Sequence, residues 1–579
     1  MDTTQTIPIQ YLLLGGNASV KTSTSWHKID WGKVTLVVKS LQQRIAQAIR
    51  QGKWHKSKRL QGLLSHCYAA KLLAIRRVTQ NKGKRTAGVD GCTWRTAKDK
   101  LNAIAGLQLK GYKSSPLRRV NIPKGNGKTR PLGIPTMRDR AMQALYLLSL
   151  EPISETTGDW NSYGFRPHRS CADAIGSCFV RLSRRTSPQW ILEGDIKGCF
   201  DNISHEWIEQ HIPLPKKLLK EWLQAGYVEK GRLYPTKSGT PQGGIISPTI
   251  ANMVLDGLES HIDKACDLKR MGEKTTRRHN TRQIYFVRYA DDFIVTSTDR
   301  EYLEQVVKPA IQTFLASRGL ELSEEKTRIS HIEQGFDFLG QNIRRFKGGL
   351  LIRPAKKSIT NFLKKVKMVI DKQKEVTPQT LIRTLNPMIK GWAMYHRHVV
   401  SKRIFSRLDH EIFKKIWSWC KRKHRGRWKS MKWLKKRYFT AIQGRNWLFY
   451  DKVVDKRDKT DKNKSSKILL CQASAIRIKR HIKIRCNANP YLLEQEPYFE
   501  SRIQRAMLQK SDTQKQLTEI YGRQKGKCAY CHQPISIASG WHIHHKVYRV
   551  NGGKNTTDNL VLLHPDCHKS VHATGFSFA

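Results

Sequence analysis

Residues 286–295, FVRYADDFIV, place two adjacent carboxylates between two apolar runs. The first run ends at Tyr289 and the second begins at Phe293, so the segment predicts a tight β-hairpin with Asp291 and Asp292 at its tip. Adjacent acids repel each other, and partial burial favours their protonated forms. A divalent cation such as Mg²⁺, which prefers oxygen ligands, removes that cost. A solvent-facing Asp-Asp turn is the alternative, and the rest of the chain decides between the two.

Two blocks upstream of the hairpin supply residues suited to the same chemistry. Residues 190–205, WILEGDIKGCFDNISH, contain an apolar strand that leads to Asp195. Residues 239–255, GTPQGGIISPTIANMVL, are a Gly-rich turn that runs into a helix. Two-metal phosphoryl transfer needs carboxylates held on separate strands, and Asp195 together with the hairpin pair meets this need.

In this order, the three blocks resemble the palm domain of reverse transcriptases, whose active site carries Tyr-Ala-Asp-Asp between two strands. The resemblance implies that Asp195, Asp291 and Asp292 are catalytic and hold two Mg²⁺ ions. It also implies that the backbone carbonyl of Ile196 is an additional metal ligand.

The same resemblance implies a nucleotide pocket beside these acids. Phe200 would lie under the nucleotide sugar and exclude a 2′-hydroxyl, while plain core packing is the alternative for this ring. Gln242 and Gly243 would contact the incoming nucleotide and the template, and the Gly pair lets the backbone come close. We expect Asp201 only to cap the helix that begins near Ser204.

A basic segment precedes the palm blocks. Residues 118–140, RRVNIPKGNGKTRPLGIPTMRDR, predict a strand, a turn, a strand and a helix. In the resembling family this is the fingers region, where Lys128 or Arg130 would contact the triphosphate, and a solvated basic hairpin is the alternative. Residues 163–175, YGFRPHRSCADAI, resemble another block of the family, in which a basic loop enters a helix. A simple helix cap is the alternative for its polar residues.

Composition narrows the class of protein. The 579 residues are enough for about three to five domains. Lys and Arg number 106 against 46 Asp and Glu, which gives a net charge of +60 and indicates a polyanionic partner, nucleic acid. A mean hydropathy of -0.57 and the lack of a long apolar run predict no membrane span, and the short apolar patch at 9–14 lacks the basic region of a signal peptide. Twelve Cys with one C-x-x-C indicate a reducing compartment, so we expect a cytoplasmic protein, associated with the nucleoid when bound to DNA.

The segments flanking the palm blocks favour one group of reverse transcriptases. Residues 384–397, TLNPMIKGWAMYHR, resemble the maturase segment of group II intron proteins, which doubles as the polymerase thumb. This implies binding of structured intron RNA through its shape, phosphates and 2′-hydroxyls. The charge run at 451–467 has no apolar period and predicts a solvated linker, and the basic stretch that follows to 515 would be the family's DNA-binding region.

The C-terminal segment carries metal-ligand spacings. Cys528 and Cys531 form C-x-x-C, and His564 and Cys567 form H-x-x-C, a pattern typical of a closed structural Zn²⁺ site. A His in place of a fourth Cys departs from an all-Cys knuckle. Chance proximity of the four residues is the alternative.

Together with residues 541–564, this segment resembles the HNH endonucleases, a β-hairpin and a helix around one divalent metal ion. The resemblance implies that His544 binds the metal, that His545 is the general base and that Asn559 orients the loop. His568 and His572 lie four residues apart, so a helix places them on one face, where they would complete the metal site. His542 is expected to be a bystander.

The sequence is therefore identified as a member of the group II intron-encoded proteins, with reverse transcriptase, maturase and HNH endonuclease activities. We expect an α+β multidomain fold, a right-hand polymerase with fingers, an antiparallel palm sheet and a helical thumb, plus a small ββα-metal module. The expected units are an N-terminal helical extension (1–85), fingers and palm (86–345), thumb (346–450), a basic linker and DNA-binding region (451–515) and the HNH module (516–579).

The expected partners are group II intron RNA, target DNA and deoxynucleoside triphosphates, and the oligomeric state, for which a homodimer is one option, stays open. Two other classes of protein also stay open. One is an RNA-binding splicing factor without polymerase activity, against which the intact Asp195, Asp291 and Asp292 argue. The other is a non-intron bacterial reverse transcriptase, against which the basic thumb and the HNH tail both count.

Overall fold

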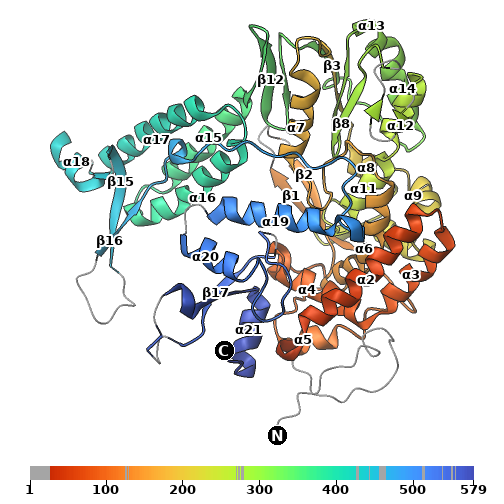
Figure 1. Cartoon of the computed structure of the whole chain (residues 1–579), viewed down its shortest axis with the longest axis horizontal. Coiled ribbons are helices and arrows are strands. Elements are labelled where there is room, and N and C mark those ends of the chain that lie inside the picture. The colour runs from red at the N-terminus through yellow and green to blue at the C-terminus, as the bar shows by residue number, and fades with distance from the viewer. Residues whose placement is uncertain are drawn as a thin grey trace.

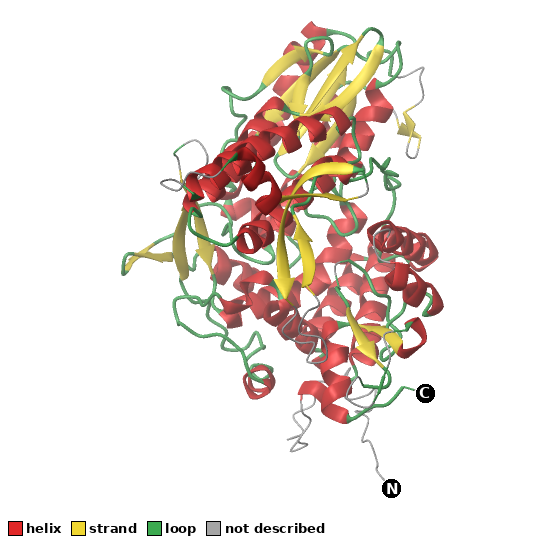
Figure 2. Ribbon diagram, turned by 90° about the vertical axis from the view of Figure 1, so that its left-hand side faces the viewer, coloured by secondary structure: helices red, strands yellow, loops and turns green. Residues whose placement is uncertain are grey.

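The computed structural model describes residues 26–123, 127, 129–268, 270–271, 274–275, 280–424, 430–442, 444–454, 465–511, 515–537, 539–548, 552–553 and 556–578. The palm strands gather at the top of Figure 2, and the N-terminal helices lie below them. Among the described residues, none of the helices is long and apolar enough to span a membrane.

From Trp26 onward the N-terminal region is helical, as the sequence predicts, and residues 1–25 of the predicted extension lie outside the described residues. Its elements are η1 (Trp26–Lys28), α2 (Trp31–Arg50), α3 (Trp54–His66), α4 (Tyr68–Gln80), η2 (Lys82–Arg85) and α5 (Ala97–Asn102). Gly52, with φ +69°, ends the first long helix, and Cys67 in an extended conformation separates the next two. The buried faces of α2 and α4 pack on α6 (Met137–Thr157), which joins this region to the polymerase body (Figure 1).

The predicted basic hairpin is present. β1 (Leu117–Pro123) pairs antiparallel with β2 (Thr129–Ile134), and β4 (Tyr227–Glu229) and β5 (Arg232–Tyr234) extend the sheet in the order β2-β1-β4-β5. The predicted helix follows as α6. Lys128 lies outside the described residues.

The palm is an antiparallel sheet in the order β10-β3-β9-β8, which confirms the predicted sheet and hairpin. Its strands are β3 (Trp190–Asp195), β8 (Tyr285–Tyr289), β9 (Asp292–Ser297) and β10 (Arg328–His331). The helices and short strands around it are α7 (Cys171–Leu182), α8 (Cys199–Asn202), α9 (His205–His211), α10 (Lys216–Leu223), α11 (Ser247–Leu255), α12 (Leu258–Ala265), β6 (Arg270–Met271), β7 (Lys274–Thr275), α13 (Arg300–Tyr302), the π-helical turn η3 (Leu303–Val307) and α14 (Lys308–Ala316).

In the segment 319–329 the strand begins only at Arg328, and the turn before it brings Lys326 to Asp195. A three-stranded sheet follows, made of β11 (Phe336–Phe338), β12 (Gln341–Phe346) and β13 (Gly349–Pro354).

The thumb is a helical unit with its own core. α15 (Lys356–Lys372), α16 (Pro378–His396), α17 (Lys402–Lys423) and α18 (Met431–Tyr438) pack around buried Phe405, Leu408 and Ile412. β14 (Phe439–Ile442), β15 (Arg445–Val454) and β16 (Ser465–Leu469) form a sheet beside them. The expected solvated linker at 451–467 is therefore wrong at both ends, because Lys452–Val454 pair antiparallel with Ser465–Lys467. Residues 455–464 of this segment lie outside the described residues.

After β16 the chain returns across the palm as an extended segment, residues 470–495. Arg169 on the palm donates to the Cys486 carbonyl at 2.9 Å, and Asn489 donates to Thr156 Oγ1 at 3.0 Å. Asp173 accepts from the Ser170 amide as the alternative of a helix cap requires, and it also accepts from Ile484 N at 2.7 Å. This segment thus fastens the thumb to the palm, while its expected DNA-binding role stays a prediction. It includes η4 (Ala473–Ala475) and η5 (Leu493–Gln495) and leads into α19 (Glu496–Ser511) and α20 (Lys515–Arg523).

The C-terminal module has the predicted hairpin and helix. β17 (His542–His545) pairs antiparallel with β18 (Leu560–Leu563), preceded by η7 (Thr557–Asn559), and α21 (Pro565–Thr574) follows. The module rests on the N-terminal helices (Figure 1), where Arg76 Nε lies 2.9 Å from Asp566 Oδ2. The carbonyl of Cys531 lies so near Gly32 that a Cβ there would come within 2.9 Å of it.

The backbone before α7 supports the palm hairpin from behind. The amide of Tyr163 donates to the carbonyl of Arg288 at 2.9 Å, and a Cβ added at Gly164 would come within 2.3 Å of the amide nitrogen of Ala290. Ala290 is the turn residue that precedes Asp291, and it has φ +58°. Only glycine therefore fits at position 164 without displacing the turn.

We predict that Gly164→Ala lowers the free energy of unfolding by about 1–3 kcal/mol, the usual cost of overpacking, and reduces primer extension because the hairpin tip moves. Gly62→Ala in α3 is the matched control, since a Cβ at Gly62 meets nothing within 4 Å and alanine favours helix. Denaturant unfolding and primer extension measure both effects. Equal behaviour of the two variants would contradict the steric argument.

Candidate functional site

Three carboxylates converge at one edge of the palm sheet. Asp195, the last residue of β3, is in register with Asp292, the first residue of β9. Asp291 lies in the turn between Tyr289 and Asp292, which are themselves paired across the hairpin. The sequence-predicted trio is thus brought together from two separate strands and a turn.

The electrostatics of this edge match three crowded acids. Burial raises the pKa of Asp291, and the charge of Asp195 adds to the shift. Burial, with Asp291 and Asp195 close by, raises the pKa of Asp292 to about 6. Oxygen ligands that repel one another in this way gain stability from a divalent cation, so the donor set fits such an ion.

Lys326 is a residue at this edge that sequence reasoning missed. Its Nζ lies 2.7 Å from Asp195 Oδ2, and this hydrogen bond raises the pKa of Lys326. One lysine in a charged turn carries no local signal, because only the pairing of β10 with β3 brings it to Asp195. The amide of Ser323 donates to the carbonyl of Asp195 at 2.8 Å, which fixes the backbone leading into Ile196.

A buried cation beneath the hairpin was also missed. The side chain of Arg288 is fully buried, forms an ion pair with Asp256 and lies 3.9 Å from Asp159 Oδ2. Arg288 stands in the apolar strand β8, two positions before Ala290 in the turn. A charge inside an apolar run was the available signal, since such residues are buried only when they are paired.

Two of the residues predicted to bind the nucleotide connect the fingers to the palm. Arg130 Nε donates to Gln242 Oε1 at 2.7 Å, and Gln242 Nε2 donates to Asp201 Oδ1 at 3.1 Å. The expectation that Asp201 caps the following helix is wrong, because Ser204 accepts from the Trp207 amide and is itself the cap. Asp201 instead belongs to the short helix α8 and faces Gln242.

Phe200 and Gly243 both lie in close packing. Phe200 is 9% exposed and belongs to the main hydrophobic core, with its ring edge toward Phe165 at 6.2 Å between centroids. Gly243 lies so near β2 that a Cβ there would come within 2.1 Å of the Gly133 carbonyl oxygen. Close approach of fingers and palm therefore requires glycine at position 243.

The second cluster is made of histidines in the C-terminal module. One ring nitrogen from each of His544, His568 and His572 lies within 4.8 Å of the others. Burial and the two neighbouring histidines lower the pKa of His544 to about 4, so its imidazole is neutral and able to bind a metal. His542, on the same face of β17 as His544, also contacts the ring of His568, with centroids 5.0 Å apart.

The predicted general base His545 and the predicted loop-orienting residue Asn559 lie on and beside the β17–β18 hairpin. His545 is the last residue of β17 and is in register with Leu560. Asn559 accepts from the Val547 amide at 2.8 Å and donates to the Val547 carbonyl at 3.1 Å. The side chain of Asn559 thus holds the loop that follows β17.

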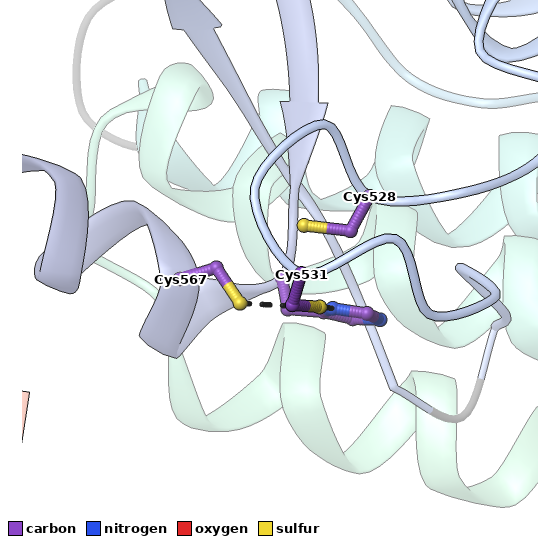
Figure 3. Close-up of side chains that lie close together, drawn as sticks. Cys528, Cys531 and Cys567 are labelled. Carbon is purple, nitrogen blue, oxygen red and sulfur yellow. Dashed lines mark hydrogen bonds between the residues drawn. The ribbon is translucent and has the colours of Figure 1, made fainter. Parts of the chain in front are cut away.

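The third cluster is Cys528, Cys531, His564 and Cys567, whose ligand atoms all lie within 4.8 Å of one another. Figure 3 shows the three cysteines directed toward one another from the knuckle turn and from α21. Cys531 Sγ lies 3.3 Å from His564 Nδ1. Four such ligands at this separation fit a closed tetrahedral metal site.

Four family models match the chain. They are the N-terminal domain of reverse transcriptase (residues 26–107), reverse transcriptase, an RNA-dependent DNA polymerase (122–343), the maturase-specific domain of group II introns (359–439) and HNH endonuclease (528–574).

Several known proteins are similar to this chain. Protein YkfC of Escherichia coli (strain K12) is 32% identical over 306 residues, 47% of this chain and 79% of that protein. The group II intron-encoded protein LtrA of Lactococcus lactis subsp. cremoris is 33% identical over 340 residues, 49% of this chain and 56% of LtrA. The chain thus spans about half the length of LtrA. A structure of telomerase from Candida albicans aligns over 54% of this chain and 59% of that chain with a TM-score of 0.30 and 13% identity, too weak a likeness to support an inference.

We predict that Asp292→Asn stabilises the metal-free protein at pH 7.5. The pKa of the Asp292 carboxyl is about 6 in the folded protein and near 4 in the unfolded chain. Ionisation of this carboxyl therefore destabilises the fold as the pH rises from about 4 to about 6, and below about pH 4 the carboxyl does not lower the stability. The melting temperature of the variant should therefore exceed that of the parent at pH 7.5 in a chelator, and the difference should vanish near pH 4. Glu324→Gln, an exposed acid in the turn before β10, is the control. A less stable Asn variant at pH 7.5 would contradict the electrostatic argument.

Proposed function

The chain belongs to the group II intron-encoded proteins that combine a reverse transcriptase, a maturase domain and an HNH endonuclease, and from this membership we propose how its three sites act together. The protein copies intron RNA into DNA, promotes splicing of that RNA and nicks the target DNA. The observation that carries the proposal is the register of Asp195 with Asp292, which places acids from two strands and a turn at one point.

In the polymerase, Asp195, Asp291 and Asp292 hold two Mg²⁺ ions, with the carbonyl of Ile196 as an additional ligand. When bound, the ions activate the primer hydroxyl and stabilise the charge of the leaving pyrophosphate. Lys326 reduces the repulsion among the acids and holds the Asp195 carboxylate in place, which the 2.7 Å contact supports.

The incoming deoxynucleoside triphosphate lies between fingers and palm. Arg130 and Lys128 contact the triphosphate, and Gln242 and Gly243 contact the nucleotide and the template. Phe200 blocks a 2′-hydroxyl and so selects deoxynucleotides. The short distance from Arg130 to Gln242 supports a single pocket formed by both elements.

The thumb binds the intron RNA. Its exposed faces carry the cations of α15, α17 and α18, and Lys435 lies over the exposed ring of Trp447 at 4.4 Å. Phosphate contacts of this kind give strong affinity that falls as the salt concentration rises. Structured RNA is recognised by such contacts and by its shape, which suits a protein that helps an intron to fold.

The C-terminal module nicks DNA. His544, His568 and His572 hold one divalent ion, His545 takes the proton from the attacking water, and Asn559 fixes the loop. Cys528, Cys531, His564 and Cys567 hold a structural Zn²⁺ ion that keeps the knuckle closed. We propose that the protein acts in the cytoplasm, at the nucleoid when it is bound to DNA, because intron RNA and target DNA meet there.

We predict that Asp291→Ala with Asp292→Ala lowers cDNA synthesis on an RNA template by at least about 10²-fold, because the charge formed in the transition state loses its stabilisation. Splicing of the cognate intron RNA should stay within about twofold of the parent, since the thumb faces are unchanged. Glu324→Ala with Glu325→Ala, an adjacent pair of exposed acids in the turn before β10, is the matched control.

The same experiment separates the competing classes of protein. A parent that promotes splicing but makes no cDNA would be a splicing factor without polymerase activity. A parent that makes cDNA but neither binds nor splices the intron RNA would be a reverse transcriptase of another kind.

We predict that His545→Ala abolishes nicking of target DNA, since water loses its general base, while primer extension is unchanged. His542→Ala, in the same strand but outside the three-histidine cluster, should retain nicking. Nicking of labelled DNA with Mg²⁺ measures both. Full nicking by the His545 variant would assign the base to another residue.

A further inference from the structure

Three side chains form a continuous hydrogen-bonded chain from the fingers to the palm. Which atoms donate and which accept along it is fixed by the two side chains at its ends. The guanidinium of Arg130 can only donate hydrogen bonds, and the carboxylate of Asp201 can only accept them. Gln242 lies between the two, so its amide oxygen must face Arg130 and its amide nitrogen must face Asp201. The structure has this arrangement, with Nε2 of Gln242 at 3.1 and 3.2 Å from the two oxygens of Asp201.

The backbone fixes Asp201 beside Gln242. The amide of Thr240 donates to the Phe200 carbonyl at 2.7 Å, and Ser238 Oγ donates to the Asp201 carbonyl at 2.9 Å. Gly239 has φ +82°, and a Cβ there would come within 2.4 Å of the Phe200 carbonyl oxygen. The turn that carries Gln242 is thus attached to the helix that carries Asp201, and the pair does not depend on the two side chains alone.

The other end of the chain is Arg130 in β2, on the fingers. β2 lies against the turn that carries Gln242, since a Cβ at Gly243 would come within 2.1 Å of the Gly133 carbonyl oxygen. An exposed arginine on a hairpin has many rotamers, and the Gln242 oxygen selects one of them. Asp201 lies at the end of this chain opposite Arg130. Among the side chains of the described residues, the Asp201 carboxylate accepts a hydrogen bond from Gln242 alone.

We propose that Asp201 is a positioning residue, which fixes the amide of Gln242 in one orientation and through it holds Arg130 where the triphosphate of an incoming deoxynucleotide binds. The inference rests on the proposed polymerase function. In this role Asp201 contacts neither the metal ions nor the nucleotide. Its effect is on nucleotide affinity, because the arginine is held in place before the nucleotide arrives.

The test compares Asp201→Asn, Gln242→Met and the double variant in primer extension. An Asn side chain can donate as well as accept, so Gln242 loses its fixed orientation, and Met at 242 removes both hydrogen bonds. Each single variant should raise the KM for deoxynucleotide about 3- to 10-fold, as expected for exposed charged hydrogen bonds, with kcat within about twofold. The double variant should be no worse than the poorer single variant, because both act through one chain.

Two further variants and two readouts complete the design. Glu206→Gln is the matched control, since the Glu206 carboxylate also accepts from a glutamine amide, Gln210, on the palm surface, and its KM should not change. Asp201→Glu keeps the carboxylate and should recover part of the affinity. Equilibrium binding of a non-hydrolysable deoxynucleotide should weaken by the same factor as KM rises, and melting temperatures should match the parent.

Additive effects of the two single substitutions would overturn the proposal, because Asp201 would then act independently of Gln242. A shift in the Mg²⁺ concentration needed for half activity in Asp201→Asn would also overturn it and would make Asp201 a metal ligand. A parent without template-directed extension would contradict the proposed function itself, whereas an active parent with additive variants contradicts only this inference.

Discussion

Crowding of three carboxylates at one sheet edge is the constraint on which the rest of the polymerase depends. The strand register that sets Asp195 opposite Asp292 leaves like charges together, and burial raises the pKa of both hairpin acids. Neighbouring groups reduce this repulsion or fix the backbone around it. Lys326, in the turn before β10, lies 2.7 Å from Asp195, the charge of Arg130 acts on Asp291 from the fingers, and the amide of Ser323 fixes the end of β3. The folded protein therefore maintains a set of carboxylates whose mutual repulsion a divalent cation would relieve.

A buried ion pair supports the hairpin from beneath. Arg288 is fully buried with Asp256 and Asp159, and burial raises the pKa of Asp159 to about 7 despite the arginine. A buried ion pair seldom adds net stability, since desolvation offsets the attraction, but removing one partner is costly. Such a group specifies one register of β8, because a slip of one residue would move Arg288 to the other face. The position of the hairpin tip therefore depends on the buried ion pair beneath it.

Local patterns predicted the elements of this fold, and long-range contacts explain what they missed. The hairpin, the basic strands and the zinc-type spacings lie within short stretches, so periodicity and ligand spacing were enough to find them. Asp201 was misread because a cap was inferred from its distance to a helix, while Ser204 was available to fill that role. The charged run at 451–467 was misread because edge strands also carry lysines, so charge alone does not separate a strand from a linker. Lys326 had no local signal, since strand pairing far along the sequence places it.

The two ends of the described chain meet in one interface, and this links the nuclease to the polymerase. Arg76 in α4 pairs with Asp566 at the start of α21, both largely shielded from water, and the same guanidinium stacks on Trp31 at 4.5 Å. The Cys531 carbonyl oxygen lies so close to Gly32 that any larger residue at position 32 would clash with it. The surface of the knuckle around Cys531 is therefore also a contact with α2. Because α2 and α4 pack on α6, which leads out of the fingers, the Cys/His knuckle is positioned relative to the polymerase core through α2, α4 and α6.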